Sequence, residues 1–529
     1  MLATGRVHRI CFARVPGFLR SRRLRWLAPL MASLLAPGPA GAIETIKLKL
    51  PMLQDTFTVK VADLRNPNAL LEGSSDLAEL NRATNGEIGR RLNEMLGSPL
   101  PVQMRAVVRN AVGSPLLDQV LLLISALGEI DGLPDQPRAA SAELEQALQQ
   151  AAAKNSGKVT LVDVLAVIPG QTATVDLNRF LTALGRLKQQ QLAAVPLVAA
   201  TAPATVDANL SEPGPAKPQG RRVNLTVSHR STPLPAVVIE PQGPANGRLV
   251  VISHGLWDGP ESFQGWGEHL ASHGYTVVLP HHPGSDETHK QAMLSGKAPP
   301  PGPVELQLRP RDVSAVIDAA AAGTLQLTRP VNTRSVLVAG HSWGATTALQ
   351  LAGARPSSLE LQQFCSDVRD PARNLSWVLQ CSFLDSADRS GLADPRITAA
   401  VAVSPPMRLL FAPGAGDAMN AKVLLVSGTR DWVVPVGPEA IDPVRNLSNR
   451  GQLGGHRLVL AEGGDHFNLR GPSSTGGGPL RGLILAWFDG NAVLPASGWG
   501  DNAVPLRDVT PAVVNGQPQP LRSPAGSSR

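Results

Sequence analysis

The sequence predicts an α/β fold in which helices flank a mostly parallel β-sheet. Apolar runs of strand type alternate with helix-forming runs from residue 222 to about residue 487, and this alternation is typical of a parallel sheet covered on both faces. One run, at 336–339, enters a G-x-S-x-G turn and is followed by a helix-forming run at 346–351. An aspartate and a histidine follow two later strands, so polar groups gather where the strands of such a sheet end.

The G-x-S-x-G turn consists of Gly340-His341-Ser342-Trp343-Gly344. In a turn of this type the serine lies at a sharp strand-to-helix corner, so its Oγ is exposed above the sheet and small residues must flank it. The motif alone means little in a chain with 50 glycines, because chance matches are common. The strand before it and the helix after it supply the required context, and they make Ser342 a candidate nucleophile.

An aspartate and a histidine complete the chemistry that this serine needs. Asp431 follows an apolar run at 422–428, and His466 follows a short strand-like run at 456–460. A serine hydroxyl is a weak nucleophile, so an imidazole must take its proton and a carboxylate must orient that imidazole. The chain order of serine, aspartate and histidine is the one expected of an α/β-hydrolase fold, which is therefore the predicted fold.

Other polar groups are weaker candidates. Asp465 adjoins the histidine and is expected to point elsewhere, and Asp385 is a more distant rival for the acid. Asp431 as a surface turn residue and His466 as a structural loop residue are the alternatives to their catalytic roles. No metal and no cofactor is expected, because no ligand spacing supports one in the polar cluster of His281, His282, Asp286 and His289.

Acyl transfer also needs donors for the developing oxyanion. An apolar strand ends at His254 and Gly255, and this pair precedes the serine by one strand–helix–strand–helix stretch, as the fold requires. In this fold one donor is the amide after the nucleophile, here Trp343, and the other comes from the loop after an earlier strand, here Leu256. We expect His254, Gly255 and Trp257 to lie against the substrate. A plain strand-to-loop turn with a structural histidine is the alternative.

With these residues in place, residues 222–490 resemble α/β-hydrolases of the dienelactone-hydrolase-like and platelet-activating-factor-acetylhydrolase-like group. The resemblance implies ester hydrolysis by a serine. Dienelactone hydrolases use a cysteine where this chain has Ser342, and the acetylhydrolases carry their acid after the strand at 397–403, where this chain has Ser404-Pro405. The acid therefore falls to Asp431. The matching segments are Ser253-His254-Gly255-Leu256, residues 270–278, His282-Pro283-Gly284-Ser285, Arg309-Pro310-x-Asp312-Val313 and the G-x-S-x-G turn.

A chain of 529 residues is too long for one core, so two folded domains are expected. The first resembles a cyanobacterial domain of unknown function that precedes such hydrolases, most clearly at 160–165. It is predicted to be mainly helical, with strands at 44–50 and 57–61, helices at 116–127 and 142–152 and a helix start at Thr160. The predicted boundaries are 1–42 for a signal peptide, 43–195 for the N-terminal domain, 196–221 for a linker, 222–494 for the catalytic domain and 495–529 for a mobile tail.

Residues 1–42 have the composition of a signal peptide. They hold seven arginines, no acidic residue, a short apolar run at 26–35 and an Ala40-Gly41-Ala42 cleavage pattern. Without those arginines the chain has 42 basic and 42 acidic residues, so the net charge gives no reason to expect a nucleic-acid partner. We expect export to the periplasm, the thylakoid lumen or the extracellular space, with a retained anchor as the alternative. No later transmembrane segment is expected.

Cys365 and Cys381 remain after signal removal, within an insertion at about 356–396. An even pair of cysteines in an oxidising compartment predicts a disulfide, with two buried thiols as the alternative. The insertion is rich in large apolar residues. It is expected either to wall an acyl pocket as a lid or simply to pack onto the domain.

The sequence thus predicts a secreted serine esterase that forms an acyl-enzyme on Ser342 and acts on a small-molecule or lipid-like ester, as in lipid degradation. A catalytically idle fold used for binding or assembly is the alternative from another class. A lactonase or a peptidase would use the same triad. Because nucleophile, acid, base and oxyanion loop are all present, the enzyme is favoured. The sequence gives no oligomeric state.

Overall fold

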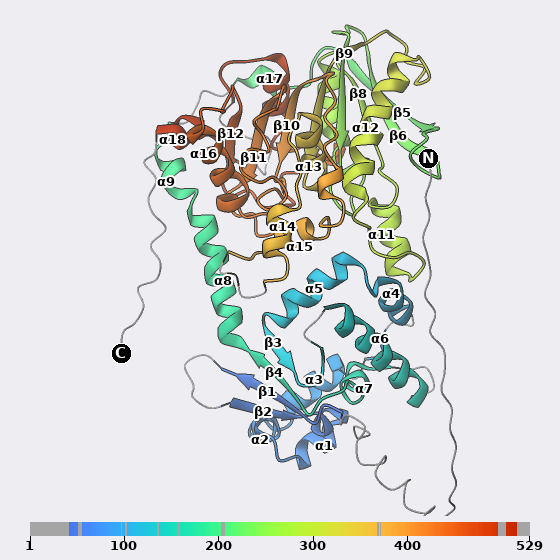
Figure 1. Cartoon of the computed structure of the whole chain (residues 1–529), viewed down its shortest axis with the longest axis vertical. Helices are drawn as coiled ribbons and strands as arrows, with labels where there is room; N and C mark the ends of the chain where they lie inside the picture. Colours follow the sequence, from blue (N-terminus) through green and yellow to red (C-terminus); the bar gives the residue numbers. More distant parts are fainter. Residues whose placement is uncertain are drawn as a thin grey trace, which may run out of the picture. The chain divides into compact units, whose positions relative to one another are not determined.

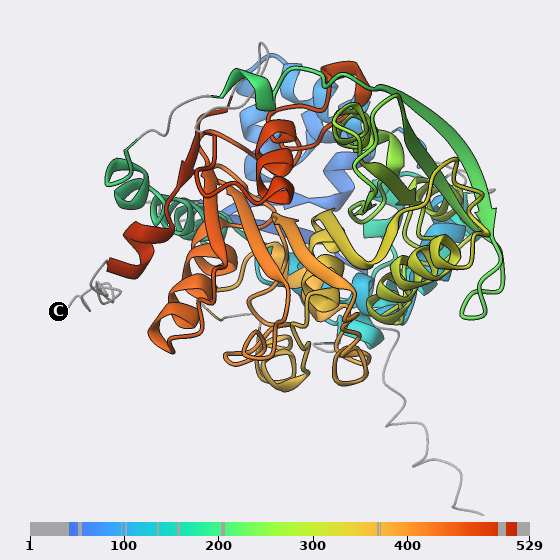
Figure 2. The same cartoon turned by 90° about the horizontal axis from the view of Figure 1, so that it is seen from above.

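The computed structural model describes residues 42–50, 56–96, 98–100, 103–134, 137–155, 159–202, 207–367, 370, 372–495 and 504–515. Figure 1 shows the elements coloured along the chain, and Figure 2 shows them from above. The predicted signal peptide lies outside the described residues except for Ala42.

A small mixed sheet lies in the N-terminal region, with the strand order β2-β1-β4-β3. β1 and β2 correspond to the two strands that the sequence predicts, and they pair in antiparallel fashion. β3 and β4 lie where the sequence predicts helix, so that part of the prediction is wrong. The alternating threonines and valine of β4 favour an extended chain instead. The strands are β1 (Thr45–Lys49), β2 (Thr56–Lys60), β3 (Gly128–Ile130) and β4 (Thr172–Asp176).

Helices pack with this sheet, and their starts follow from the sequence. The Ser114 side chain accepts from the amide of Leu117 at the start of α5, and Thr160 and Asp163 form a reciprocal capping box at α7. The elements are η1 (Val61–Arg65), α1 (Pro67–Glu72), α2 (Asp76–Ala83), α3 (Glu87–Leu96), α4 (Met104–Ala111), α5 (Pro115–Ser125), α6 (Pro137–Lys154), α7 (Leu161–Leu165) and α8 (Leu177–Leu192).

In the described ranges, no single helix combines the length and the apolar character that a membrane span requires. α4 and α5 meet the criterion only as a pair, and they are bent by 103° relative to each other.

The larger sheet has nine strands in the order β13-β12-β11-β10-β9-β7-β8-β6-β5. Strands β7 to β12 pair in parallel, whereas β5, β6 and β13 pair in antiparallel fashion with their neighbours. The parallel strands are apolar on both faces, as a sheet covered by two helix layers requires. The strands are β5 (Lys217–Leu225), β6 (Leu234–Gln242), β7 (Arg248–Ser253), β8 (Thr276–Pro280), β9 (Asn332–His341), β10 (Ile397–Val403), β11 (Lys422–Gly428), β12 (Arg457–Ala461) and β13 (Leu506–Asp508).

Helices cover both faces of this sheet (Figure 2). One face shares an apolar core with α12, α13 and α16, and the other shares a core with α10 and α17. The helices are α10 (Gln264–Ser272), α11 (Glu287–Leu294), α12 (Glu305–Ala321), α13 (Trp343–Leu351), α14 (Leu359–Phe364), α15 (Ser376–Cys381), α16 (Asp442–Asn449) and α17 (Arg481–Asp489), with the short turns η3 (Pro260–Ser262), η4 (Ala387–Arg389), η5 (Gly437–Ile441) and η6 (Ser473–Thr475).

The insertion between α13 and β10 has a core of its own. Cys365 and Cys381 form a disulfide with 5.6 Å between their Cα atoms. Both cysteines pack with Trp377 and Phe383 against Trp343, whose ring lies 4.5 Å from that of Phe383. The apolar side chains of the insertion therefore pack onto the first residue of α13, which is the packing alternative that the sequence left open.

Two segments differ from the predicted domain plan. The expected linker contains most of α9 (Val195–Ala199), the turn η2 (Ala208–Leu210) and the start of β5, and the expected tail contains β13 and α18 (Thr510–Asn515). Leu197 and Val513 are buried in the core of the large domain, and β13 covers the edge of β12. The predictions of a linker and of a mobile tail are therefore wrong for the described residues. The few apolar residues that anchor these segments are not apparent in a composition rich in proline and small residues.

His269 on α10 gives a testable link between pH and stability. Its ring donates to the carbonyl of Leu210 at 2.9 Å, yet burial lowers its pKa to about 4. The unfolded chain therefore binds a proton that the folded chain does not, and stability falls as the pH decreases through 6.5. Going from about pH 7.5 to about pH 5.5, the wild type is expected to lose about 1.4 kcal/mol more unfolding free energy than His269→Gln, whose amide can still donate. Denaturant unfolding measures both losses, and equal losses would contradict this account.

Candidate functional site

The carboxyl ends of the parallel strands bring the predicted site residues to one edge of the large sheet. β7 leads into His254, β9 into Ser342, β11 into the loop of Asp431 and β12 into the loop of His466. Parallel neighbours deliver their loops to the same edge, which is where ligands of such sheets bind.

Ser342 lies at a strained corner between β9 and α13. Its φ is +55°, a value that costs a non-glycine residue on the order of 1–3 kcal/mol. Close backbone contacts require the flanking glycines: a Cβ on Gly340 would lie 2.1 Å from the carbonyl oxygen of Gly344, and one on Gly344 would lie 1.9 Å from that of Ser253. The Ser342 amide donates to the carbonyl of Val403 at 2.9 Å. This is the backbone geometry that a nucleophile elbow needs.

Asp431 and His466 are joined by a buried hydrogen bond. His466 Nδ1 donates to Asp431 Oδ2 at 2.9 Å, and the carboxylate is fully buried. Its other oxygen accepts from the amides of Val433 and Val434 at 2.9 and 2.7 Å. The carboxylate is thus held on both sides, and it fixes the imidazole with Nε2 turned away from it. An acid in this arrangement can maintain the tautomer that a general base needs.

His341 links the elbow to the loop of the base. Its Nε2 donates to the carbonyl of His466 at 2.8 Å, and the two rings lie 4.7 Å apart. Within the described residues, the Oγ of Ser342 makes no hydrogen bond to the His466 ring. Contacts of this kind often tighten only when substrate is bound. The structure therefore ties the loop of His466 to the residue before Ser342 without a hydrogen bond between the two side chains.

The oxyanion loop, residues 254–257, borders the elbow. A Cβ built on Gly255 would lie 3.2 Å from the Cβ of Ser342, so the glycine permits a close approach. In the described part of the chain the Leu256 amide donates to no protein group, which leaves it available to an oxyanion. The side chains of Leu256 and Trp343 both pack in the core of the insertion, so one apolar cluster supports the two expected donor residues.

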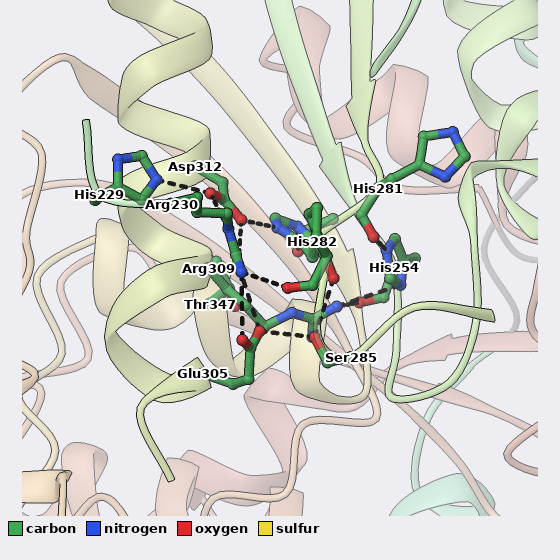
Figure 3. A network of polar contacts seen from close by, with 12 residues as sticks. His229, Arg230, His254, His281, His282, Ser285, Glu305, Arg309, Asp312 and Thr347 are labelled. Atoms are coloured by element: carbon green, nitrogen blue, oxygen red, sulfur yellow. Dashed lines mark hydrogen bonds and ion pairs between the residues drawn. The ribbon is translucent and has the colours of Figure 1, made fainter. Parts of the chain in front are cut away.

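A second Ser–His–Asp chain lies behind the oxyanion loop (Figure 3). The Oγ of Ser253 lies 2.9 Å from His282 Nε2, and His282 Nδ1 lies 2.8 Å from Asp312 Oδ2. Because a carboxylate only accepts, we assign the ring proton to Nδ1, so that Nε2 accepts from the serine hydroxyl. The sequence analysis did not identify these three residues as a unit, although each stands in a segment that carries the family resemblance.

This second chain is sealed inside the domain. Ser253, His282 and Asp312 are all fully buried. Burial and, next to it, the charge of Arg309 lower the pKa of His282 to about 3, so this ring is a poor base. Burial also raises the pKa of Asp312, but hydrogen bonds outweigh it and hold that pKa below its usual range. Figure 3 shows the Asp312 carboxylate between His282 and two further donors, His229 and Arg230.

His254 differs from its expected role. The sequence places it against the substrate, but only 1% of the residue is exposed. Its ring lies between Arg309, whose Nη2 is 3.2 Å from Nδ1, and the carbonyl of His281, to which Nε2 donates. The reason is that α12 and the segment after β8 both supply polar partners to the ring, so the imidazole faces the protein interior. Trp257, in contrast, is partly exposed and has a φ of +57°.

The other candidates for the acid and for a metal site have different surroundings. Asp465 accepts from two amides of its own loop, and Asp385 is exposed in the insertion. Ser404, at the position where the acetylhydrolases carry their acid, is buried and has no carboxylate. Asp286 caps α11. Over the described residues, no group of three or more histidine, cysteine or acidic side chains is arranged to hold a metal ion.

Two family models match the chain. Residues 248–360 match a model described as the alpha/beta hydrolase fold, and residues 42–176 match one described as an alpha/beta hydrolase of unknown function (DUF1400). No curated protein matches the chain. The predicted α/β-hydrolase fold is thereby confirmed, whereas the resemblance to dienelactone hydrolases and acetylhydrolases stays a prediction.

Because of its disulfide, the insertion is expected to respond to reduction before the rest of the chain does. The bond joins residues 16 positions apart, and a loop of this size restrains the unfolded state by about 3 kcal/mol. We expect alkylation without reductant to modify neither Cys365 nor Cys381, and reduction to expose the segment 356–396 to protease first. Mass spectrometry of the purified protein measures both the alkylation and the order of cleavage. Two alkylated cysteines before reduction would refute the bond.

Proposed function

We propose that this chain, whose large domain has the α/β-hydrolase fold, is a serine hydrolase of carboxylic esters. Ser342 attacks the ester carbonyl while His466 takes its proton, and the alcohol leaves with that proton. Water then releases the acid from the serine. Asp431 orients the ring and stabilises its cation, and the amides of Leu256 and Trp343 are the proposed oxyanion donors.

One observation carries this proposal. It is the buried 2.9 Å hydrogen bond between Asp431 and His466. The loop of His466 also accepts a hydrogen bond from His341, the residue before Ser342 at the strained elbow. Structural ion pairs also occur in cores, but a strained serine beside a histidine with an oriented ring matches the requirements of acyl transfer.

Access from the surface favours Ser342, His466 and Asp431 as the catalytic residues over the second Ser–His–Asp chain. Trp432 and Phe467 follow the proposed acid and base directly in sequence, each is 48% exposed, and their rings lie 6.0 Å apart. The proposed site therefore adjoins the surface. His282 and its partners are fully buried, and a substrate carbonyl cannot reach Ser253 without unfolding of the loop that covers it.

The same aromatic pair supports an uncharged or lipid-like ester as substrate. Trp432 and Phe467 offer apolar area at the surface of the site, and large aromatic side chains at a pocket favour apolar ligand groups. Export of the chain is part of this proposal. The disulfide in the insertion supports it, because such bonds persist mainly in oxidising compartments.

Replacement of the nucleophile gives the first test. Ser342→Ala is expected to lower kcat on p-nitrophenyl esters by at least about 10⁴-fold, because nucleophile and base act as a unit. A fluorophosphonate probe should label the wild type on Ser342 and leave the variant unlabelled. Ser253→Ala is the control and should keep its label. A labelled Ser342→Ala protein, or a wild type labelled on another residue, would refute the assignment.

Replacement of the acid gives the second test. Asp431→Asn keeps the shape of the side chain but loses the charge that orients the imidazole, so kcat is expected to fall by roughly 10⁴-fold. Asp465→Asn, the matched control in the neighbouring loop, should be nearly silent. Steady-state kinetics of both variants decides between the two aspartates. If the control lost more activity than Asp431→Asn, the acid would be Asp465.

A further inference from the structure

Helix α12 presents three charged side chains to the back of the oxyanion loop. Glu305, Arg309 and Asp312 are spaced by four and three residues, so they lie on one face of the helix. All three are buried, and Figure 3 shows them facing the segments that follow β7 and β8. The proposed reaction uses none of them directly, so their burial calls for a physical reason.

Arg309 contacts the loop most closely. It is 1% exposed, and its Nη2 donates to the carbonyl oxygens of His254 at 2.6 Å and Gly255 at 3.3 Å. The Gly255 oxygen also lies 2.7 Å from His254 Nδ1, a ring nitrogen that Arg309 itself contacts. Its Nε and Nη1 have no hydrogen-bond partner among the described residues. Burial lowers the pKa of Arg309 to about 10, so the group remains a cation at neutral pH. A buried cation with unpaired donors is costly, and here its hydrogen bonds go to two adjacent carbonyls and to the ring of His254.

We propose that Arg309 is a positioning residue that aims the Leu256 amide at the oxyanion. This inference rests on the proposed function. In a trans peptide the C=O and the N–H point in opposite directions, and the structure has no cis peptide bond among the described residues. The Gly255 carbonyl shares its peptide with the Leu256 amide. When Arg309 holds that carbonyl, the amide is directed away from the guanidinium.

Backbone strain in the two loops is an independent sign that they are held. Trp257 has a φ of +57° and His282 a φ of +52°, and each such residue costs on the order of 1–3 kcal/mol. The Trp257 amide donates to the carbonyl of Ser285 at 2.7 Å, and the hydroxyl of Ser285 donates to Glu305 at 2.8 Å. Both strained segments are therefore tied to α12.

The second Ser–His–Asp chain completes this support. Asp312 fixes the ring of His282, which accepts from Ser253 at the end of β7, while Arg309 holds the next two carbonyls. Arg230 bonds to both Asp312 and Glu305, so one cation neutralises the two carboxylates beside Arg309. The group that resembles a triad thus serves as a support for the oxyanion loop.

Substitution of Arg309 tests the inference. Arg309→Met removes the donors and keeps the length of the side chain, and Arg309→Lys keeps the charge. For Arg309→Met, kcat on p-nitrophenyl acetate, normalised to the number of titrated active sites, is expected to fall by about 10²–10³-fold. This is the usual effect of losing one oxyanion donor. KM should be nearly unchanged. The Ki of an aryl trifluoromethyl ketone should rise by about the same factor as kcat/KM falls. Arg309→Lys should lose about tenfold in both quantities.

The control is Arg396→Met. Arg396 binds Asp318 near the other end of α12 and Asp394 before β10, so its replacement removes another arginine that contacts α12 and leaves the oxyanion loop intact. It should lose stability but keep kcat and Ki. If Arg309→Met does not fold, Arg309→Lys decides: a parallel tenfold loss supports the inference and wild-type values overturn it.

The outcomes separate the inference from the proposed function. A wild type that forms an acyl-enzyme, together with Arg309 variants that keep their kcat per site and ketone affinity, would overturn the inference alone and make Arg309 a structural residue. A wild type that neither forms an acyl-enzyme nor binds the ketone would overturn both.

Discussion

The contact between the elbow and the end of β7 is the constraint on which the rest of the site depends. The backbone at Gly344 approaches the Ser253 carbonyl so closely that a Cβ there would lie 1.9 Å from the oxygen. That approach sets the strained φ of Ser342 and places the serine against Gly255. Because β7 and β9 are neighbours in the sheet, the proposed nucleophile and the proposed oxyanion loop form one unit, which needs support from the protein interior.

Two sets of serine, histidine and aspartate meet at this contact, and access from the surface separates their proposed roles. Asp431 and His466 lie beside a half-exposed aromatic pair, whereas His282 and Asp312 are sealed behind the loop. The same pairing of a histidine with a buried aspartate can thus serve the proposed chemistry in one place and rigidity in another. In the sealed chain, low basicity and the pairing with Arg230 suit a fixed support, because a neutral ring and a neutralised carboxylate do not change with pH near neutrality.

The sequence is sufficient to predict the features of the fold and of the site that depend on local context. Ser342, Asp431 and His466 each follow an apolar strand, and parallel strands bring such loops together, so the contact between Asp431 and His466 could be predicted without coordinates. The buried cluster behind the oxyanion loop could not be predicted, because the pairing of His282 with Asp312 depends on how α12 packs. The sequence feature that indicates this cluster is the four- and three-residue spacing of Glu305, Arg309 and Asp312. β13 and α18 were missed because a few apolar anchors, such as Leu506, are diluted in a proline- and glycine-rich segment.

The most direct test of the central claim is to locate the acyl group. A p-nitrophenyl ester is mixed with the wild type, the reaction is quenched with acid within milliseconds, and the peptides are mapped by mass spectrometry. The account predicts one acyl group per chain, on Ser342, that disappears as turnover ends. An acyl group on Ser253, or turnover with no acylated peptide in the described ranges, would contradict it.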